Sequence, residues 1–375
     1  KELPQLTDSQ RDNIIRFLAM IRNVDTHMGQ LRDFLRARGV DRNTILIFMT
    51  DNGSTFGPLY YNAGMKGAKR SLWEGGHRVP CFIHWPDGGI GEPRDIGGLT
   101  EVQDILPTLI DFCGLEQPGG RGLDGISLAS ALRGTEKVPE DRMLVVNYSR
   151  MPGADYPTPD SESIIRREGA AVLWKRWRLL EETALYDLDS DPGQESNIIN
   201  RHPDVVRRMQ EFLDAWWEDV APSANEVLPV TIGSDKENPV MLTACEWMDV
   251  FMDQQAQVRN GVRKNSYWQL NVERAGTYSF ELRRWPLESG LHLTEASPAG
   301  NLTDGKVDEG FALPVARARL LIERRFHVQT VKPGDEAAVF TVKLKAGPTL
   351  LHTWFDDARN QPICGAYYVY VSRID

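Results

Sequence analysis

The feature that most constrains the fold is a long amphipathic segment followed directly by a short apolar run. From about residue 9 to residue 38, apolar residues recur at steps of three and four, and Gly39 then ends the pattern. The next segment, NTILIFMT, is rich in β-branched and aromatic residues, so we expect a strand over residues 44–50 that is buried on both faces. A helix followed by such a strand predicts an α/β fold.

Further elements extend this α/β pattern. We expect a second strand in VPCFIHWP (79–86) and a helix over residues 100–113 that ends at Gly114. Residues 115–162 are rich in Gly, Pro and Asp and are expected to be mostly loop, with a strand near 142–148. Two strand-like segments, AAVLWKRWRLL and TALYDLDSDPGQESN, then precede a helix from about residue 203 to residue 217.

The pattern changes from about residue 227. Short alternating stretches such as SYWQLNV, GTYSFELRRW and AAVFTVKLKAG are separated by Gly and Pro, which is typical of antiparallel strands. We therefore expect an all-β, sandwich-like domain over residues 226–375.

Composition and charge exclude several classes of protein. The 375 residues have room for about two domains, and the net charge of −10 argues against a general nucleic-acid-binding protein. No apolar run approaches the roughly 18 residues that cross a bilayer, so no membrane partner is expected.

The four cysteines lie far apart and form no Cys-x-x-Cys pair, so neither a zinc ribbon nor a dithiol redox site is expected. Cys81 and Cys113 lie within apolar runs and are expected to be buried thiols. A disulfide between Cys245 and Cys364 is left open, because sequence cannot test the distance between them.

The stretch MTDNGSTFG places Asp51, Asn52 and Gly53 at the end of the first expected strand. Asp-Asn-Gly is favourable turn chemistry, because Asn tolerates and Gly readily adopts the left-handed region. Carboxylate and amide oxygens at a strand end are also hard ligands that suit Ca²⁺. The turn and the metal site are compatible.

Residues 62–80, NAGMKGAKRSLWEGGHRVP, resemble the second signature of the sulfatases, in which a lysine stands five residues before Glu-Gly-Gly and Arg-x-Pro follows. The matching positions are Lys69, Glu74, Gly75, Gly76, Arg78 and Pro80. The resemblance extends over roughly residues 10–220 and implies an alkaline-phosphatase-like fold. Residues 1–140 would be the C-terminal part of the sulfatase sheet, residues 141–225 its small α+β subdomain, and residues 226–375 an appended β-sandwich.

The resemblance also implies roles for single residues. Asp51 and Asn52 correspond to two ligands of one divalent cation, usually Ca²⁺, and Lys69 corresponds to the lysine that contacts the sulfate oxygens. Glu74 and Arg78 are expected to brace the loop, and His77 is given no role. Candidates for the leaving-group pocket are the loop aromatics Phe56, Tyr60 and Tyr61.

One departure from the family is large. Sulfatases use a Cys-x-Pro-x-Arg or Ser-x-Pro-x-Arg segment whose first residue becomes the formylglycine nucleophile, and no such segment occurs here. The remaining metal-binding aspartates, a lysine and the histidines of the family site are also missing. Because these groups lie upstream of the long helix in the family, the chain is expected to be the C-terminal portion of a sulfatase and inactive alone. The missing N-terminal part is then a partner, and its absence would expose an apolar sheet edge.

Three functions follow from these observations. The first is sulfuric ester hydrolysis in the intact enzyme, arylsulfatase-like and extending to sulfated carbohydrates, in an exported, periplasmic or secreted protein. The second is hydrolysis of phosphate or phosphonate esters, which Asn52 disfavours because a two-zinc site prefers histidine there. The third is a non-catalytic carbohydrate-binding protein that uses tryptophans of the β domain, namely Trp247, Trp268, Trp285 or Trp354.

Overall fold

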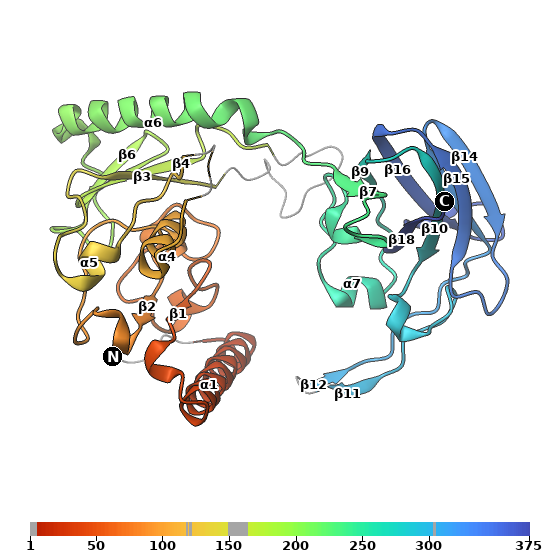
Figure 1. Ribbon diagram of the computed structural model, residues 1–375, viewed down its shortest axis with the longest axis horizontal. Helices are drawn as coiled ribbons and strands as arrows, with labels where there is room; N and C mark the ends of the chain where they lie inside the picture. Colours follow the sequence, from red (N-terminus) through yellow and green to blue (C-terminus); the bar gives the residue numbers. More distant parts are fainter. Residues whose placement is uncertain (1–5, 118, 120–121, 149–163, 303–304) are drawn as a thin grey trace. The chain divides into compact units, whose positions relative to one another are not determined.

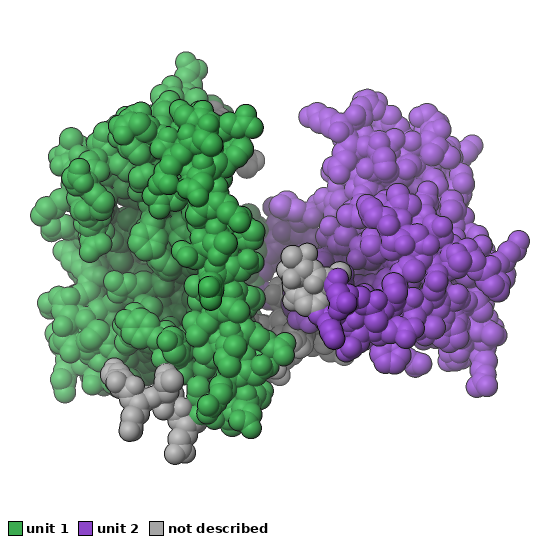
Figure 2. Space-filling model, turned by 90° about the horizontal axis from the view of Figure 1, so that it is seen from below, with its two compact units in different colours: residues 1–149, 165–224 green, residues 150–164, 225–375 purple. Residues whose placement is uncertain are grey.

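The computed structural model describes residues 6–117, 119, 122–148, 164–302 and 305–375. The chain divides into two compact units (Figure 1, Figure 2). Unit 1 comprises residues 1–149 and 165–224, and unit 2 comprises residues 150–164 and 225–375. The division of unit 1 into two sulfatase domains at residue 140 stays a prediction. Within the described ranges, no helix is long and apolar enough to span a bilayer.

Helix α1 (Asp8–Ala37) confirms the long helix expected from the sequence. Thr7 and Gln10 form a capping box, in which the Thr7 hydroxyl accepts from the Gln10 N–H and the Gln10 side chain accepts from the Thr7 N–H. Ile14 is the one buried residue of α1 in the described chain. The apolar residues of α1 that stay exposed are Ile15, Leu18, Met20, Ile21, Val24, Leu31 and Phe34.

Strands β1 (Leu46–Met49) and β2 (Cys81–His84) form a two-stranded antiparallel sheet, with Leu46 opposite His84 and Met49 opposite Cys81. The expectation that the first strand is buried on both faces is wrong. All four residues of β1 are half-buried, and Phe82 of β2 is 65% exposed. A sheet of two strands has no neighbours beyond either edge and cannot enclose its own faces.

The cysteines also differ from expectation. Cys81 lies on exposed β2, and Cys113 at the end of a surface helix is also exposed. Both were expected to be buried. All four cysteines are free thiols, so Cys245 and Cys364 do not form a disulfide.

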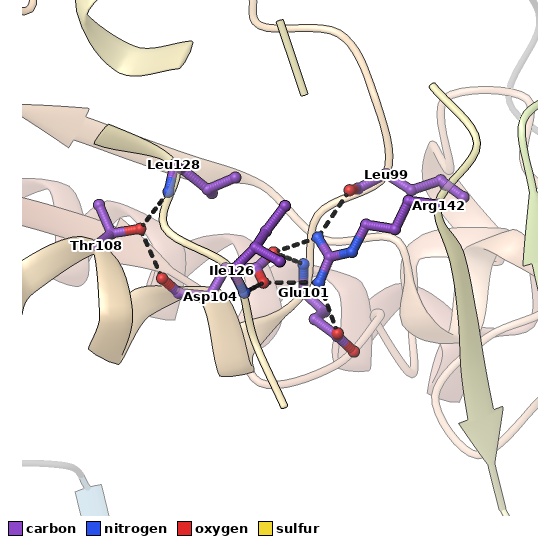
Figure 3. A network of polar contacts seen from close by, with 7 residues as sticks. All are labelled: Leu99, Glu101, Asp104, Thr108, Ile126, Leu128 and Arg142. Atoms are coloured by element: carbon purple, nitrogen blue, oxygen red, sulfur yellow. Dashed lines mark hydrogen bonds and ion pairs between the residues drawn. The ribbon is translucent and has the colours of Figure 1, made fainter. Parts of the chain in front are cut away.

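A polar network holds the middle of unit 1 together (Figure 3). The Asp104 side chain is fully buried and accepts two hydrogen bonds of 2.7 Å from the guanidinium of Arg142. It also accepts from the backbone N–H groups of Glu101 and Ile126. Thr108 accepts from the Leu128 N–H. The network joins the helical segment η3 (Val102–Asp104) and helix α4 (Ile105–Cys113) to the residues that precede α5 (Ala129–Arg133) and β3 (Met143–Asn147).

The remainder of unit 1 is a four-stranded antiparallel sheet in the order β3-β4-β5-β6. Its further strands are β4 (Ala170–Trp174), β5 (Trp177–Leu180) and β6 (Ala184–Asp187). Helix α6 (Pro203–Ala224) buries Met209 and Leu213 in one core with Val172 and Leu179 of the sheet. The α+β character expected of this region is therefore confirmed, and α6 is longer than expected. Short helix α5 was missed, because Gly and Pro dominate its surroundings.

Unit 2 is almost entirely β-structure, as expected. Its elements are β7 (Val230–Ile232), β8 (Val240–Thr243), α7 (Gln255–Arg259), β9 (Tyr267–Val272), β10 (Gly276–Arg283), β11 (Gly300–Leu302), β12 (Gly305–Val307), β13 (Arg317–Ile322), β14 (Arg325–Thr330), β15 (Ala338–Leu344), β16 (Gly347–Asp356), β17 (Pro362–Cys364) and β18 (Tyr368–Arg373).

Two sheets enclose one hydrophobic core in unit 2. One sheet has the order β15-β10-β18-β8, and the other has the order β14-β13-β16-β9-β7 with β17 paired to β16. Buried and exposed residues alternate along the strands, so that one face of each sheet enters the core. Three of the four tryptophans proposed to bind sugars, Trp247, Trp268 and Trp285, belong to this core and are at most 5% exposed. They cannot stack on a sugar, and the hypothesis is wrong for them.

The pKa of Asp104 carries a consequence for stability. Burial alone would raise this pKa, but the hydrogen bonds from Arg142 and from the backbone amides outweigh burial and lower the pKa below its ordinary value. A lowered pKa means that the ionised carboxylate stabilises the folded state above the unfolded pKa. That contribution is lost as the pH falls through the lowered pKa of the folded state.

We predict that Asp104→Ala lowers the free energy of unfolding of unit 1 by about 3 kcal/mol, because it leaves the Arg142 guanidinium without its buried partner. Asp12→Ala is the control, since its ion pair with Arg16 is exposed on α1 and is worth less than about 0.5 kcal/mol. Urea denaturation of the two variants at pH 7 measures the difference. Equal losses in both would contradict the role given to the network.

Candidate functional site

The turn after β1 and the loop that carries the signature motif (residues 62–80, the signature loop) are joined through their backbones. The Gly53 N–H donates to the Gly76 carbonyl at 2.9 Å, and the Lys69 N–H donates to the Ser54 carbonyl at 3.2 Å. A Cβ atom on Gly53 would lie 1.8 Å from the Gly75 carbonyl oxygen. Glycine at this position therefore allows the two segments to touch. The fold brings together two motifs that are separate in the sequence.

The side chains of Asp51 and Lys69 project from the joined segments and are exposed. Neither side chain makes a hydrogen bond or ion pair with any part of the chain that the structure describes. Asn52 is half-buried, and its backbone carbonyl accepts from the Thr50 hydroxyl at 3.2 Å. A carboxylate, an amide and an ammonium are thus presented from one loop assembly without competing partners.

The donor set suits a hard cation but is small. Asp51 and Asn52 offer oxygen ligands directly after β1, which is where the sequence predicted them. Across the described residues, no group of three His, Cys, Asp or Glu side chains is placed to hold a metal ion. Ligation of one cation by Asp51 and Asn52 together stays a prediction.

Lys66 has a different role from Lys69. Its ammonium donates to the Gln194 carbonyl at 3.0 Å and lies 4.1 Å from the centre of the Trp73 ring. The Glu195 carboxylate is 4.0 Å away. Lys66 therefore fastens the signature loop to the segment that follows β6, and Lys69 is the lysine that is left available to a ligand.

Glu74 supports the signature loop from a buried position. It begins the short helix α3 (Glu74–His77) and is 2% exposed. Its Oε1 lies 2.6 Å from Nε of Arg178 in β5, and its Oε2 lies 3.6 Å from Arg78. The Gln194 side chain accepts from the Glu74 N–H at 3.0 Å. Glu74 and Arg78 thus contact other residues of the protein and support the loop, as expected from the sequence.

Arg178 and Gln194 are the residues of this assembly that sequence reasoning missed. Both are buried and both lie more than a hundred positions beyond the segments that they support. The one available signal was Arg178 between the apolar residues Trp177 and Leu179, because a buried guanidinium requires a carboxylate partner. The identity of that partner is not encoded locally.

His77 and the loop aromatics have separate environments. Burial lowers the pKa of His77, Arg178 and Arg78 lower it further, and Glu74 opposes them. His77 is therefore neutral at pH 7 and fills space beside Glu74. Phe56 packs against Phe17 of α1 with ring centres 5.7 Å apart. Tyr60, at the end of α2 (Gly57–Tyr60), and Tyr61 are 49% and 74% exposed.

Comparison with known proteins agrees with these features. Residues 2–115 match the sulfatase family model. A sulfatase of Formosa agariphila is 29% identical over 220 residues, which cover 53% of this chain and 39% of that protein. The N-acetylglucosamine-6-O-sulfatase of Bacteroides thetaiotaomicron is 27% identical over 201 residues, covering 52% of this chain and 34% of that protein.

The resemblance to the sulfatases, a family of hydrolases, is therefore confirmed. The chain spans about 40% or less of the length of these curated relatives. Among solved structures, "Ps i-CgsB in complex with k-i-k-neocarrahexaose" shares 23% identity with a TM-score of 0.48, over 59% of this chain and 46% of that one.

We predict that Gly53→Ala lowers the free energy of unfolding by about 2 kcal/mol, because the new methyl group overlaps the Gly75 carbonyl and forces the two segments apart. The backbone N–H of Lys69 should exchange faster with solvent, since its acceptor moves away. Thermal or urea denaturation and hydrogen exchange measure these effects.

The control is Gly29→Ala on α1, where an added Cβ meets no atom within 4 Å. It should raise stability by up to about 1 kcal/mol, because Ala is the better helix former. If Gly53→Ala is as stable as Gly29→Ala, the close approach of the two segments is not required.

Proposed function

We propose that this chain is part of a sulfate-ester hydrolase and supplies two ligands of its metal ion and one sulfate-binding lysine. The observation that carries the proposal is the hydrogen-bonded assembly of the turn after β1 with the signature loop. The side chains of Asp51 and Lys69 are exposed and have no partner among the described residues, so that one loop assembly presents a carboxylate and an ammonium group. The similarity to curated sulfatases supports this interpretation.

Asp51 and Asn52 would hold the cation, for which Ca²⁺ fits the carboxylate and amide donors. Because Ca²⁺ takes about six to eight oxygen ligands, two side chains form only part of the site. When bound, the cation supplies positive charge to the sulfuryl oxygens. The remaining ligands would come from groups outside the described part of this chain.

Lys69 would donate a hydrogen bond from its ammonium to a sulfuryl oxygen and stabilise the negative charge that develops in the transition state. Such stabilisation needs a donor that is already in place. The backbone hydrogen bond between Lys69 and Ser54 and the buried pair of Glu74 with Arg178 hold the loop in position. Lys66, which is bound to the Gln194 carbonyl, is not available for this task.

We infer that the nucleophile lies on a part of the protein outside this sequence. No Cys-x-Pro-x-Arg or Ser-x-Pro-x-Arg segment occurs among the 375 residues. The exposed apolar stripe of α1 and the incompletely buried β1 and β2 are what a larger sheet would cover. The proposed partner is accordingly the N-terminal part of the same protein, which would add strands and complete the metal site.

The proposed reaction consumes one water and converts a sulfate ester to an alcohol and sulfate. We propose a sulfated carbohydrate as the substrate, because one curated relative is an N-acetylglucosamine-6-O-sulfatase. Tyr60 and Tyr61 are exposed beside the assembly's loops and are the candidates to contact the alcohol. A phosphate or phosphonate ester is less suited to a site with Asn52 as ligand. An exported location, periplasmic or secreted, completes the proposal.

The first prediction from this proposal concerns the chain by itself. Purified free of other sulfatases, it should not hydrolyse an aryl sulfate with or without added Ca²⁺, because neither a nucleophile nor a complete metal site is encoded. Release of the phenol above the uncatalysed rate would show that another residue of this chain acts as the nucleophile.

A second prediction concerns Lys69 in the complete enzyme. Lys69→Ala should lower kcat on an aryl sulfate by about 10²-fold, the scale of effect when a preorganised charge-stabilising donor is removed. The thermal melting temperature should stay unchanged, since the Lys69 side chain is exposed and makes no described contact. Steady-state kinetics and thermal melts measure both.

The matched control is Arg70→Asn, the adjacent exposed cation, because Asn tolerates the positive φ of 73° found there. Lys66→Ala is unsuitable, since it would remove the contacts to Gln194 and Trp73. Similar losses of kcat in the Lys69 and Arg70 variants would mean that general electrostatics, not contact by Lys69, accounts for the effect.

A further inference from the structure

The outer face of the six-stranded sheet in unit 2 carries a row of aromatic side chains. Along β16, Leu351, Thr353 and Phe355 enter the core. Because side chains alternate along a strand, Leu350, His352 and Trp354 lie on the opposite face. We call the following outward set the aromatic face: Tyr267, Leu321, Phe326, Val328, Leu350, His352 and Trp354.

The rings of this face form one continuous row. The centres of the His352 and Trp354 rings are 3.9 Å apart, Tyr267 lies 6.4 Å from His352, and Phe326 lies 5.8 Å from Trp354. Phe326, Val328 and Leu350 are each more than half exposed. The row crosses strands β9, β16 and β14 and presents an apolar surface on the side of the sheet away from the core. An apolar patch of this kind on a sheet indicates a binding surface.

Two arginines border the aromatic face. Arg317 and Arg319 both donate to the carboxylate of Asp356, which is fully buried, at 2.7 to 3.0 Å. The Arg319 guanidinium lies 4.8 Å from the centre of the Trp354 ring. Two guanidinium groups share one carboxylate, and each has five N–H donors, so donors and one net positive charge remain for a ligand.

The other outward positions of these strands add no negative charge. Gln269 and Asn271 on β9 and Thr330 on β14 are neutral hydrogen-bonding residues. Asp356 is the one carboxylate at the outward positions of β9, β13, β14 and β16. The face is therefore locally positive on a chain whose net charge is −10.

A pocket lies beside the C-terminal end of β16, next to Asp356. Asp357, which follows Asp356 directly, lines a cavity of about 400 Å³ together with Arg263, Gln361, Leu313 and Pro362. Arg263 and Gln361 are exposed and offer further donors. Ring surfaces, amides and guanidinium groups are the combination that binds sugars through their apolar faces, hydroxyl groups and anionic substituents.

We propose that the aromatic face of unit 2 binds a sulfated polysaccharide, with the rings against the apolar faces of successive sugars and with Arg317 and Arg319 facing sulfate groups. The choice of a sulfated chain rests on the proposed function, and the charge of the face agrees with it. Such a surface would hold a polymeric substrate to the enzyme independently of hydrolysis. Of the four tryptophans that the sequence suggested for sugar binding, Trp354 is the one that belongs to this surface.

The test compares dextran sulfate with uncharged dextran, which differ only in sulfate, using the full chain and isothermal titration calorimetry. Dextran sulfate should bind, and dextran should bind at least about tenfold more weakly. Phe326→Ala and Trp354→Ala should each weaken binding of dextran sulfate by about tenfold, the ratio that corresponds to losing one ring contact of about 1.4 kcal/mol.

The matched control is Val339→Ala on β15, an exposed apolar residue of the other sheet that should leave the affinity unchanged. Thermal melts identify any unfolding of the Trp354 variant, and exposed Phe326 keeps the test valid in that case. Unchanged binding by Phe326→Ala, equal binding of dextran, or no binding of dextran sulfate would overturn the proposal. So would a dimer, seen by light scattering, that Phe326→Ala abolishes, because the face would then join two copies. Binding is measured without turnover, so an inactive complete enzyme would refute the proposed function alone.

Discussion

The buried ion pair between Glu74 and Arg178 is the interaction on which the candidate site depends. It removes two charges from water, a cost that is offset only when the geometry is good and the remaining polar atoms are satisfied. The contact of 2.6 Å meets the first condition, and Arg178 also donates to the carbonyls of Lys175 and Trp177 at 2.9 Å. The pair attaches the signature loop to β5, and the loop in turn carries Lys69 next to the turn after β1.

The candidate site therefore has a buried support, Glu74 with Arg178, and an exposed surface that carries Asp51 and Lys69. The two lysines of the loop differ in this respect. Lys66 donates to the Gln194 carbonyl and belongs to the support, whereas Lys69 is exposed to solvent without a partner in the described chain. This division has a physical reason. A donor can stabilise a developing charge only when its position is set beforehand and its hydrogen-bonding capacity is not already used.

Unit 2 divides its aromatic residues in a similar way. Trp247, Trp268 and Trp285 fill the space between two sheets, and their size helps to build a core from short strands. Trp354 lies on the other side of its sheet, in contact with His352 and Arg319. The same residue type thus stabilises the unit on one face and offers a binding surface on the other.

The sequence by itself determined the features that depend on local spacing. The period of three and four residues predicted α1, and the period of two predicted the all-β unit. The stretch MTDNGSTFG placed Asp51 and Asn52 at a strand end, and the signature motif placed Lys69 in a loop. Only the tertiary structure decided what depends on distant partners. Burial of β1 requires strands that lie beside it, and the match of Glu74 with Arg178 spans 104 positions. Trp354 is half-buried whereas Trp268 is fully buried, and this difference depends on which face of each strand meets the second sheet. Local patterns repeat along the chain and can be read there, whereas contacts between remote segments form only when the chain has folded.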